Sequence, residues 1–519
     1  MVTRIFLSIC ISATMLAQGT TTADNKTPAA ASATTSSSTD ALKSAQALLL
    51  KGKYEEAAVA FKALVEKEPA SGGAQAGLIR SLYRAEQLDE AEAAAKSAIS
   101  ALPQSAAVHA AYGDLYYRRG KLGEAEGEYR GALKLDANSA LGWWGIARIY
   151  QAVSMHKHAR DAFAKAHELD PSDPQIVRSW LATESAAKRF AGLRENILKS
   201  HSGDATYNAI ASALSEGKIW TLATEIKKTD IRLDPIFQDG THMSGFGLKV
   251  KLNDGASFVP KLDTGASGLV MGRKLAERAG VIKLADSEFG GIGDSGLVQG
   301  YLGWVEKIDI GDVEFRNCIV EVSSKSDVAD DSGLLGGNVF DKFLITIDFK
   351  DRKLQLAPLP QNPAADKNDD EAQDRYIAPE MQSYTKVFRF GKDLVVPVVV
   401  SDRTTGLFIL DTGAFANNVS PELGQEVTKV RSNDRVRVHG VSGYVKDVES
   451  GDKIMLQFGG MRVRSDDIVV IDMRAPTRWD GTEISGLIGI RTLVQMKFTI
   501  DYRDGLVNFE PYERKAARE

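Results

Sequence analysis

The 519-residue chain has few of the residues from which disulfide frameworks and thiolate metal sites are built. Its two cysteines are Cys10 and Cys318, and Cys10 lies in a short apolar segment near the N-terminus. With so few thiols, neither a disulfide framework nor a cysteine-based metal site is available. No His-Glu-x-x-His motif occurs, and His156 and His158 are spaced so that they point to different faces of a helix. We therefore expect no metal and no cofactor.

The chain also lacks a strong excess of one charge and a long apolar run. Its formal net charge is −5, which gives no reason to expect binding to nucleic acid or to an anionic membrane. The apolar run from Ile5 to Ala17 follows Arg4 and is too short for a confident membrane span. Residues 1–19 resemble a secretory signal peptide. This predicts an exported protein, periplasmic or extracellular, with the segment either cleaved or kept as an anchor.

Three segments have the composition of linkers. Residues 20–40 are rich in Thr, Ser and Ala, which cannot bury a core, and they predict a disordered tether. Residues 201–228 have the pattern of a helical connector. Residues 358–385 begin with Pro358, Pro360 and Pro363, followed by an acidic run, which predicts a second linker.

Between the first two linkers, residues 41–200 are rich in alanine and repeat with a period of 34 residues. Small residues recur in one column and large apolar residues in another, so paired helices can approach closely and the large side chains fill the groove between them. The columns are Ala57, Ala91, Ala125 and Ala159, and Phe61, Ala95, Tyr129 and Phe163. This pattern resembles the tetratricopeptide repeat, which implies an all-α solenoid whose concave face recruits a protein or peptide partner.

The remaining segments, 229–357 and 386–519, have the pattern of β-strands joined by turns. Each contains an apolar strand that ends in Asp-Thr-Gly-Ala, beginning at Asp263 and at Asp411. One such tripeptide is an ordinary Asx-turn. Two copies suggest two carboxyl groups that face each other across a near-symmetric site. Held about 3 Å apart, they cannot both ionise and must share a proton.

The two β segments follow one plan. An apolar-apolar-Gly element ends at Gly336 in the first segment and at Gly489 in the second, 73 and 78 residues after the respective aspartates. A strand ending in Asp348 or Asp501 follows, 85 and 90 residues after them. Both distances are five residues longer in the second segment, so the extra residues lie between the aspartate and the apolar-Gly element. Unrelated turns would not keep this order and spacing.

On these motifs, each segment resembles a retropepsin-type aspartic peptidase domain, and the pair resembles the two-lobed, single-chain enzymes of the pepsin class. The resemblance implies a mostly β fold with pseudo-twofold symmetry, with the lobes pairing within one chain or between chains. It implies four groups of site residues. They are the catalytic Asp263 and Asp411; the supporting Thr264, Gly265, Thr412 and Gly413; the buttressing Leu335, Gly336, Ile488 and Gly489; and the flap candidates Ile292, Gly293, Val441 and Gly443.

The sequence departs from the family pattern in two places, and each difference leads to an expectation. Pepsin-like sites usually have Ser or Thr directly after Asp-Thr-Gly, and here both positions hold alanine, Ala266 and Ala414. Without those hydroxyl groups, we expect the higher dyad pKa to lie closer to neutrality than in pepsin. Ser267 is matched by Phe415, so only the first lobe has a hydroxyl that can reach the outer carboxylate oxygen.

The sequence thus predicts an exported aspartic endopeptidase whose repeats recruit a protein partner or substrate. A second reading is a non-catalytic, extracytoplasmic peptide-binding scaffold on a retired peptidase fold. Two mutually repelling carboxyl groups favour catalysis, because a retired site has no physical reason to keep both. The substrate, the cleavage specificity, the partner of the repeats and the aspartate that carries the proton stay open.

Overall fold

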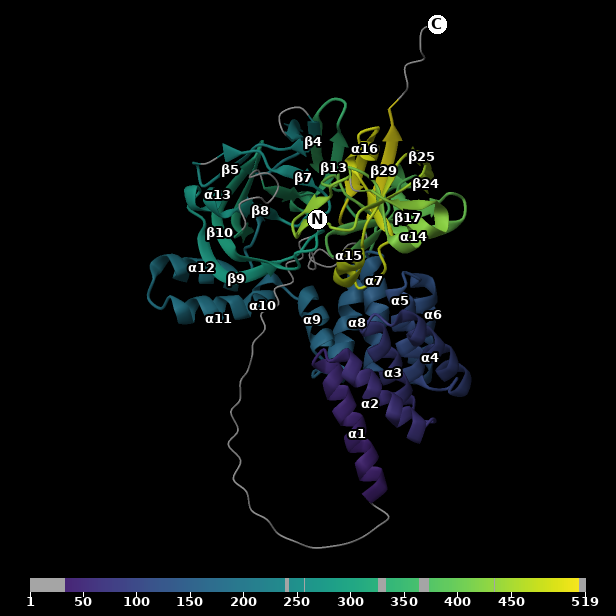
Figure 1. Cartoon of the computed structure of the whole chain (residues 1–519). Coiled ribbons are helices and arrows are strands. Elements are labelled where there is room, and N and C mark those ends of the chain that lie inside the picture. Colours follow the sequence, from purple (N-terminus) through teal and green to yellow (C-terminus); the bar gives the residue numbers. More distant parts are fainter. Residues whose placement is uncertain are drawn as a thin grey trace. The chain divides into compact units, whose positions relative to one another are not determined.

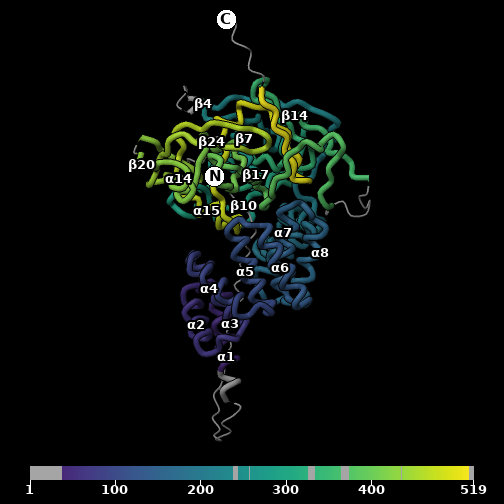
Figure 2. Tube along the Cα trace, turned by 90° about the vertical axis from the view of Figure 1, so that its right-hand side faces the viewer, coloured from purple at the N-terminus to yellow at the C-terminus, as the bar shows by residue number. Residues whose placement is uncertain are grey.

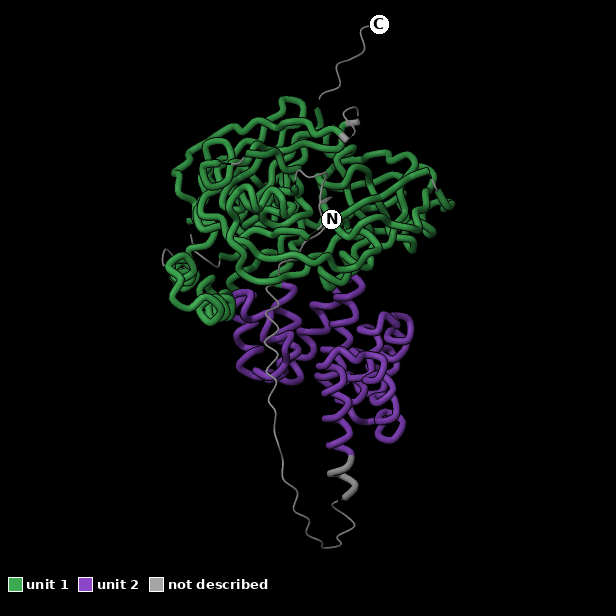
Figure 3. Tube along the Cα trace, turned by 60° about the vertical axis from the view of Figure 1, so that its left-hand side comes forward, with its two compact units in different colours: residues 1–6, 150–158, 184–519 green, residues 7–149, 159–183 purple. Residues whose placement is uncertain are grey.

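The computed structural model divides the chain into two compact units (Figure 3). Among the described residues, the helical unit holds residues up to 149 and 159–183, and the β unit holds 150–158 and the residues from 184 onward. The expected signal peptide at 1–19 lies outside the described residues. The structure describes residues 33–238, 242–255, 257–324, 333–363, 373–433 and 435–512. None of the helices in these ranges is long and apolar enough to cross a membrane.

Successive helices, joined by short turns, build the solenoid region, which confirms the fold expected for residues 41–200 (Figure 1). The first helix begins at Ala33, so the last part of the segment expected to be a disordered tether, 20–40, is helical instead. The helices are α1 (Ala33–Leu50), α2 (Tyr54–Lys67), α3 (Gly72–Arg84), α4 (Leu88–Ala101), α5 (Ala106–Arg118), α6 (Leu122–Leu135), α7 (Ala140–Ala152), α8 (His156–Leu169) and α9 (Pro174–Thr183).

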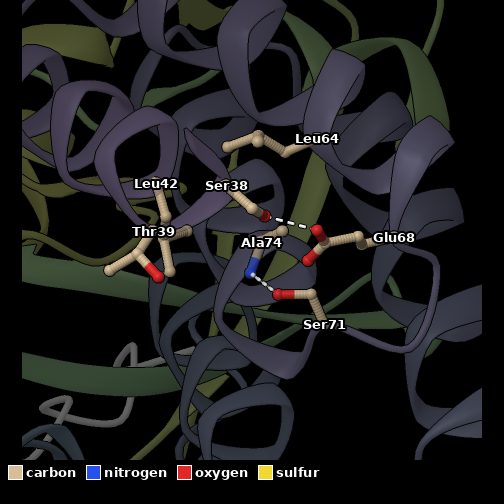
Figure 4. A pocket seen from close by; sticks show the side chains of 7 residues that line it. All are labelled: Ser38, Thr39, Leu42, Leu64, Glu68, Ser71 and Ala74. Atoms are coloured by element: carbon tan, nitrogen blue, oxygen red, sulfur yellow. Dashed lines mark hydrogen bonds between the residues drawn. The ribbon is translucent and has the colours of Figure 1, made fainter. Parts of the chain in front are cut away.

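The two repeat columns account for the packing of these helices. Ala57, Ala91, Ala125 and Ala159 are all buried, as are Phe61, Tyr129 and Phe163. The repeats also share a helix cap: the Ser71 hydroxyl accepts a hydrogen bond from the Ala74 amide at the start of α3, and Ser105 accepts one from Val108 at the start of α5. Figure 4 shows the first of these caps, beside a hydrogen bond from Ser38 to Glu68.

Three short helices open the described main part of the β unit: α10 (Ala186–Arg189), α11 (Ala191–Ser200) and α12 (Ala205–Ser215). The Tyr207 hydroxyl of α12 donates a 3.2 Å hydrogen bond to the Lys283 carbonyl. The connector expected to be helical over 201–228 is therefore helical only in part. Gly217 takes a positive φ of 68° just after α12, and the chain then forms the short strand β1 (Thr221–Leu222).

Lobe 1 is a curled sheet in the order β3-β4-β7-β12-β8-β11-β10-β5-β6, with β1 and β9 attached at its side. Its β7 and β12 run parallel, so that Leu335 lies beside Leu262 and Gly336 beside Asp263. Its elements are β3 (Asp234–Gln238), β4 (His242–Gly247), β5 (Val250–Leu252), β6 (Ser257–Phe258), β7 (Lys261–Asp263), β8 (Leu269–Gly272), α13 (Arg273–Arg278), β9 (Ile282–Phe289), β10 (Val298–Ile310), β11 (Val313–Ser323), β12 (Leu334–Gly336) and the 3-10 turn η1 (Gly337–Phe340).

Lobe 2 repeats this plan, with β18 and β27 parallel and Ile488 beside Leu410. Its sheet follows the order β20-β23-β26-β19-β27-β18-β17-β24-β25, with β16 on β17. Its elements are β16 (Phe388–Phe390), β17 (Asp393–Val400), β18 (Thr404–Leu410), β19 (Asn418–Val419), α14 (Pro421–Val427), β20 (Val430–Ser432), β21 (His439–Gly440), β22 (Gly443–Tyr444), β23 (Glu449–Gly451), β24 (Ile454–Phe458), β25 (Met461–Ser465), β26 (Ile468–Val470), α15 (Arg474–Asp480), β27 (Gly486–Ile488) and α16 (Ile490–Leu493).

A six-stranded sheet joins the lobes, in the order β15-β29-β28-β13-β14-β2. Its strand β14 is labelled in Figure 2. Its central strands pair Thr346 of lobe 1 with Thr499 of lobe 2, and their hydroxyl groups are 2.9 Å apart. These threonines occupy equivalent places in the two copies, so a pseudo-twofold axis passes between them, within one chain. The strands are β15 (Thr385–Lys386), β29 (Leu506–Pro511), β28 (Met496–Asp501), β13 (Phe343–Asp348), β14 (Lys353–Pro358) and β2 (Thr229–Arg232).

Candidate active site

The two motif aspartates stand at equivalent strand ends. Asp263 closes β7 and Asp411 directly follows β18, and neither has any exposed surface. Each carboxylate accepts backbone amides of its own loop through Oδ1: Asp263 from Gly265 at 2.9 Å, and Asp411 from Gly413 at 2.8 Å and from Ala414 at 2.9 Å. Both motifs therefore form the local turn that their residues favour, and the turn fixes each carboxyl group.

The threonines brace the two loops against each other. The Thr264 hydroxyl donates to the Leu410 carbonyl at 2.7 Å and accepts from the Thr412 amide at 3.0 Å. The Thr412 hydroxyl donates to the Leu262 carbonyl at 2.8 Å and accepts from the Thr264 amide at 3.0 Å. All four bonds are buried and cross between the lobes, so the two loops cannot move apart without breaking them together.

The glycines bring the two carboxyl groups into contact. A Cβ on Gly413 would lie 2.3 Å from Cγ of Asp263, and a Cβ on Gly265 would lie 3.0 Å from Cγ of Asp411. Each carboxyl group thus rests against the opposite loop at a point where only glycine fits. Asp263 and Asp411 are close enough to share a hydrogen bond. Among the described residues, Oδ2 of each aspartate has no other hydrogen-bond partner.

Burial and the neighbouring carboxyl group both act on the dyad. Removal from water raises the pKa of Asp263 well above its ordinary value, and the charge and hydrogen bond of Asp411 raise it further, while the Lys392 ammonium acts in the opposite direction. Burial is the largest cause of this shift. That the higher dyad pKa lies closer to neutrality than in pepsin, because both alanines lack a hydroxyl group, stays a prediction.

The residues predicted to buttress the loops lie beside them. Leu335 and Ile488 are fully buried, and the Ile488 carbonyl accepts the Asp411 amide at 3.0 Å. The Gly336 amide donates to the Gly268 carbonyl at 2.7 Å. The Gly489 amide donates to Oδ1 of Asn417 at 2.9 Å.

Two asparagines in this layer were missed by sequence reasoning. Besides Asn417, Asn338 accepts the Gly268 amide at 3.0 Å through its Oδ1. Nδ2 of Asn338 lies 3.4 Å from the Ser267 hydroxyl, so this serine contacts Asn338 rather than a dyad carboxylate. The suggestion that Ser267 supports the outer carboxylate oxygen is therefore wrong. Phe415, at the matching place, is 52% exposed and lies beneath the Arg491 guanidinium.

The four flap candidates lie at two hairpin tips that meet. Ile292 and Gly293 lie between β9 and β10, Val441 follows β21, and Gly443 begins β22. The Ser442 amide donates to the Ile292 carbonyl at 3.1 Å, and the Ser295 amide donates to the Ser442 carbonyl at 2.9 Å. The two hairpin tips, one from each lobe, are therefore hydrogen-bonded to each other.

One flap side chain reaches down to the dyad loop. Val441 of lobe 2 packs with Ala266, Val270 and Leu334 of lobe 1 in a separate apolar cluster. Tyr301 is instead part of the main core, and Tyr444 is 61% exposed. An aliphatic residue, rather than a flap tyrosine, therefore packs against Ala266, the residue directly after the Asp-Thr-Gly motif of lobe 1.

Two lysines complete the surroundings of the dyad. The Lys392 ammonium donates to the Gly265 carbonyl and, at 2.5 Å, to Oδ1 of the buried Asp393. Lys261 lies 3.5 Å from the Gly413 carbonyl. Sequence reasoning missed both contacts. Lys392 gives no local signal, because its partner in lobe 1 is 127 residues away along the chain.

Comparisons with known families agree with this geometry. The model described as "gag-polyprotein putative aspartyl protease" matches residues 248–342, and a tetratricopeptide repeat model matches residues 48–115. The chain carries a retropepsin-like aspartyl protease domain and a tetratricopeptide repeat domain. A search of curated proteins gives no match. The protease match contains Asp263, whereas lobe 2, with Asp411, is related to lobe 1 here by its spacing and by its equivalent strand pairing.

The threonine brace can be tested with Thr412→Val. The change leaves the Thr264 amide and the Leu262 carbonyl buried without partners, so we expect a loss of about 2–4 kcal/mol in the free energy of unfolding. Thr499→Val is the matched control on the same axis and should cost about 1 kcal/mol or less, because it removes one hydroxyl pair and leaves the dyad loops intact. Denaturant unfolding of both variants measures the difference, and equal losses would contradict the brace.

The mutual repulsion of the two carboxyl groups predicts that Asp263→Asn raises the free energy of unfolding by an amount that depends on pH. Since the folded-state pKa of Asp263 is raised, its contribution to stability is present at acid pH and is lost as the pH rises through that pKa. Asparagine does not titrate and can donate to Asp411. We expect the variant to be more stable than wild type by about 1–2 kcal/mol at pH 7, and by less at about pH 3.

The opposite effect on the free energy of unfolding is expected at Asp393, which is buried as fully as Asp263. Asp393→Asn leaves Lys392 without its carboxylate partner and should lower the free energy of unfolding at pH 7. Thermal unfolding of the two variants across pH tests both signs. A destabilised Asp263→Asn protein at neutral pH would show that the dyad carries no repulsion.

Proposed function

We propose that the protein is an exported aspartic endopeptidase that hydrolyses peptide bonds with the Asp263–Asp411 pair and an activated water. The observation that supports this most strongly is the opposed, buried pair of carboxyl groups held by reciprocal threonine bonds. A structural turn needs neither the second carboxyl group nor the contact between them. Export rests on the character of residues 1–19, which lie outside the described residues.

The amide bonds suggest which aspartate carries the shared proton. Asp411 accepts two backbone amides and Asp263 accepts one. Hydrogen bonds to a carboxylate stabilise its charged form, so Asp411 is the better anion. We assign the proton to Asp263, whose pKa is raised by burial and by the Asp411 charge. The assignment describes the dominant state of the pair.

In the proposed reaction, the ionised Asp411 takes a proton from a water molecule as the water oxygen attacks the peptide carbonyl carbon. The protonated Asp263 donates its proton to the carbonyl oxygen, which gives a neutral tetrahedral intermediate. Breakdown of the intermediate breaks the C–N bond: the leaving nitrogen takes up the proton from Asp411, while a hydroxyl group of the intermediate returns its proton to Asp263 as the new carboxyl group forms. The aspartates end with one shared proton, as they began.

The closed flaps define how a substrate enters. Neither aspartate is exposed in this state, so the contacts between Ile292, Ser295 and Ser442 must break before a peptide reaches the dyad. An extended peptide would then pair its backbone with the flap strands, and its side chains would point alternately into the two lobes. Closure over the peptide would exclude water from the reaction.

Cleavage by the dyad separates this proposal from a peptide-binding scaffold. Asp263→Asn and Asp411→Asn should each lower kcat/KM for a cleaved peptide by at least about 1,000-fold, and the double variant should be scarcely worse, because the pair acts as a unit. Peptide hydrolysis by purified wild type and variants measures this. Since Asp263→Asn is expected to be more stable than wild type, its loss of activity would not come from unfolding. Substantial activity in either single variant contradicts the shared-proton mechanism.

For the helical unit we propose the recruitment of a protein partner or substrate. One repeat position carries Arg80, Asp114 and Arg148 in consecutive repeats, and both arginines pair with Asp114. The Tyr129 hydroxyl also donates to Asp114 at 2.8 Å. Two guanidinium groups for one carboxylate leave this column with a net positive charge, which favours acidic partner segments.

A shortened chain tests the division of labour. Because residues 150–158 and α10 to α12 belong to the β unit, the cut belongs before residue 150 rather than at 200. We expect residues 150–519 to cleave a short peptide about as well as the full chain, within about threefold, while losing preference for a natural protein substrate. A folded fragment that cuts no peptide would show that the repeats form part of the active site.

A further inference from the structure

A glutamate stands on the same face of lobe 1 as the apolar cluster beside the dyad. In the ladder between β8 and β11, Glu321 is paired with Val270. Paired residues of neighbouring strands share a face of the sheet. Val270 belongs to the cluster with Ala266, Leu334 and the flap residue Val441. Glu321 is therefore adjacent, on this face, to the residues between the dyad loop and the closed flap.

The neighbouring positions of β11 confirm this orientation. Cys318, Val320 and Val322 all belong to the main core of the β unit. Side chains alternate between the two faces of a strand, so Glu321 points away from that core. On the other side, β10 places Leu302 opposite Glu321. The carboxyl group is thus set among aliphatic residues on the side of lobe 1 that faces the flap.

Glu321 is buried without a partner. It is 1% exposed, and neither Oε1 nor Oε2 has a hydrogen-bond partner among the described residues. Burial raises the pKa of this carboxyl group well above its usual range, against the opposing field of the Lys392 ammonium. Lys392 itself donates to the Gly265 carbonyl and to Asp393. An unpaired buried carboxyl group destabilises a fold, so its presence here calls for a ligand that pairs with it.

We propose that Glu321 is a specificity-determining residue that selects a lysine or arginine side chain of the substrate, close to the cleaved bond. The subsite is walled by Ala266, Val270 and Leu334 and is covered by Val441. This inference rests on the proposed peptidase function and names the class of its substrates.

The chemistry of the pocket fits a long cationic side chain. The aliphatic stem of lysine or arginine packs against apolar walls, while its charged head extends beyond them to a polar group. Val441 occupies this place in the closed state, and it leaves when the flaps open to admit a peptide. The incoming cation then supplies the hydrogen bonds and the charge that Glu321 lacks, and the carboxylate becomes the favoured form.

The test measures binding with the full-length protein and with peptides that cannot be cleaved. Each peptide carries a reduced amide at its central bond, and a single lysine, norleucine or glutamate at one of the four positions on either side of it. The variants are Glu321→Leu, the charge reversal Glu321→Lys, and the control Glu306→Leu. Glu306 is a glutamate of the same sheet whose side chain is 76% exposed.

We expect wild type to bind the lysine peptide at least about tenfold more tightly than its norleucine counterpart at one position, since truncating a buried charge pair is costly. Glu321→Leu should abolish this ratio and Glu306→Leu should keep it. Glu321→Lys should favour a glutamate peptide at that position. Equal binding of lysine and norleucine peptides by wild type at every position, or an unchanged ratio in Glu321→Leu, overturns the proposal.

Two further measurements distinguish a failure of this subsite from a failure of the proposed catalysis. If lysine is selected in binding but the ordinary amide peptides are never cut, the subsite stands and the proposed catalysis fails. If peptides are cut with no preference for lysine or arginine, catalysis stands and the subsite fails. Thermal unfolding should show Glu321→Leu to be at least as stable as wild type. A lower midpoint would mean that Glu321 already has a stabilising partner, and it would count against the proposal.

Discussion

The β unit depends on one unfavourable contact, the two carboxyl groups that face each other away from water. The two carboxyl groups cannot move apart, because each Oδ1 accepts amides of its own loop and each loop is braced by the opposite threonine. The pair stays together only because the remainder of the fold resists its separation. The interlobe sheet provides this resistance, as it joins β13 to β28 along the same pseudo-twofold axis.

That symmetry explains why much of the fold could be predicted. The 34-residue period in the helical unit and the repeated order of strand, Asp-Thr-Gly and apolar-Gly are local patterns that appear twice or more along the chain. Each copy supports the interpretation of the other. Leu335 and Ile488 could be placed as buttresses for this reason, and both lie beside the loops at equivalent ladder positions.

Features that depend on contacts between residues far apart along the chain could not be predicted. Lys392 reaches Gly265 across 127 residues, and Asn417 meets Gly489 across 72, and neither spacing recurs in the other lobe. Ser267 was misassigned because a hydroxyl near a carboxylate has several partners within reach, and Asn338 is the one it contacts. The helix expected beyond Ser215 ends there because Gly217 adopts a left-handed conformation that a helix cannot continue.

Some of the unpaired polar atoms of the β unit lie where a substrate would be placed in the proposed function. Oδ2 of Asp263 and of Asp411 lack partners other than each other, and both oxygens of Glu321 lack partners on the face beneath Val441. Elsewhere in the unit, buried charges such as Asp393 have an opposite charge at hand. In the proposed function, the free energy that burial of these groups costs would be recovered when a peptide supplies a carbonyl group and a cationic side chain and a water molecule enters with it. The flaps close over an incomplete site, and the same aliphatic residue that covers it must yield its place to whatever completes it.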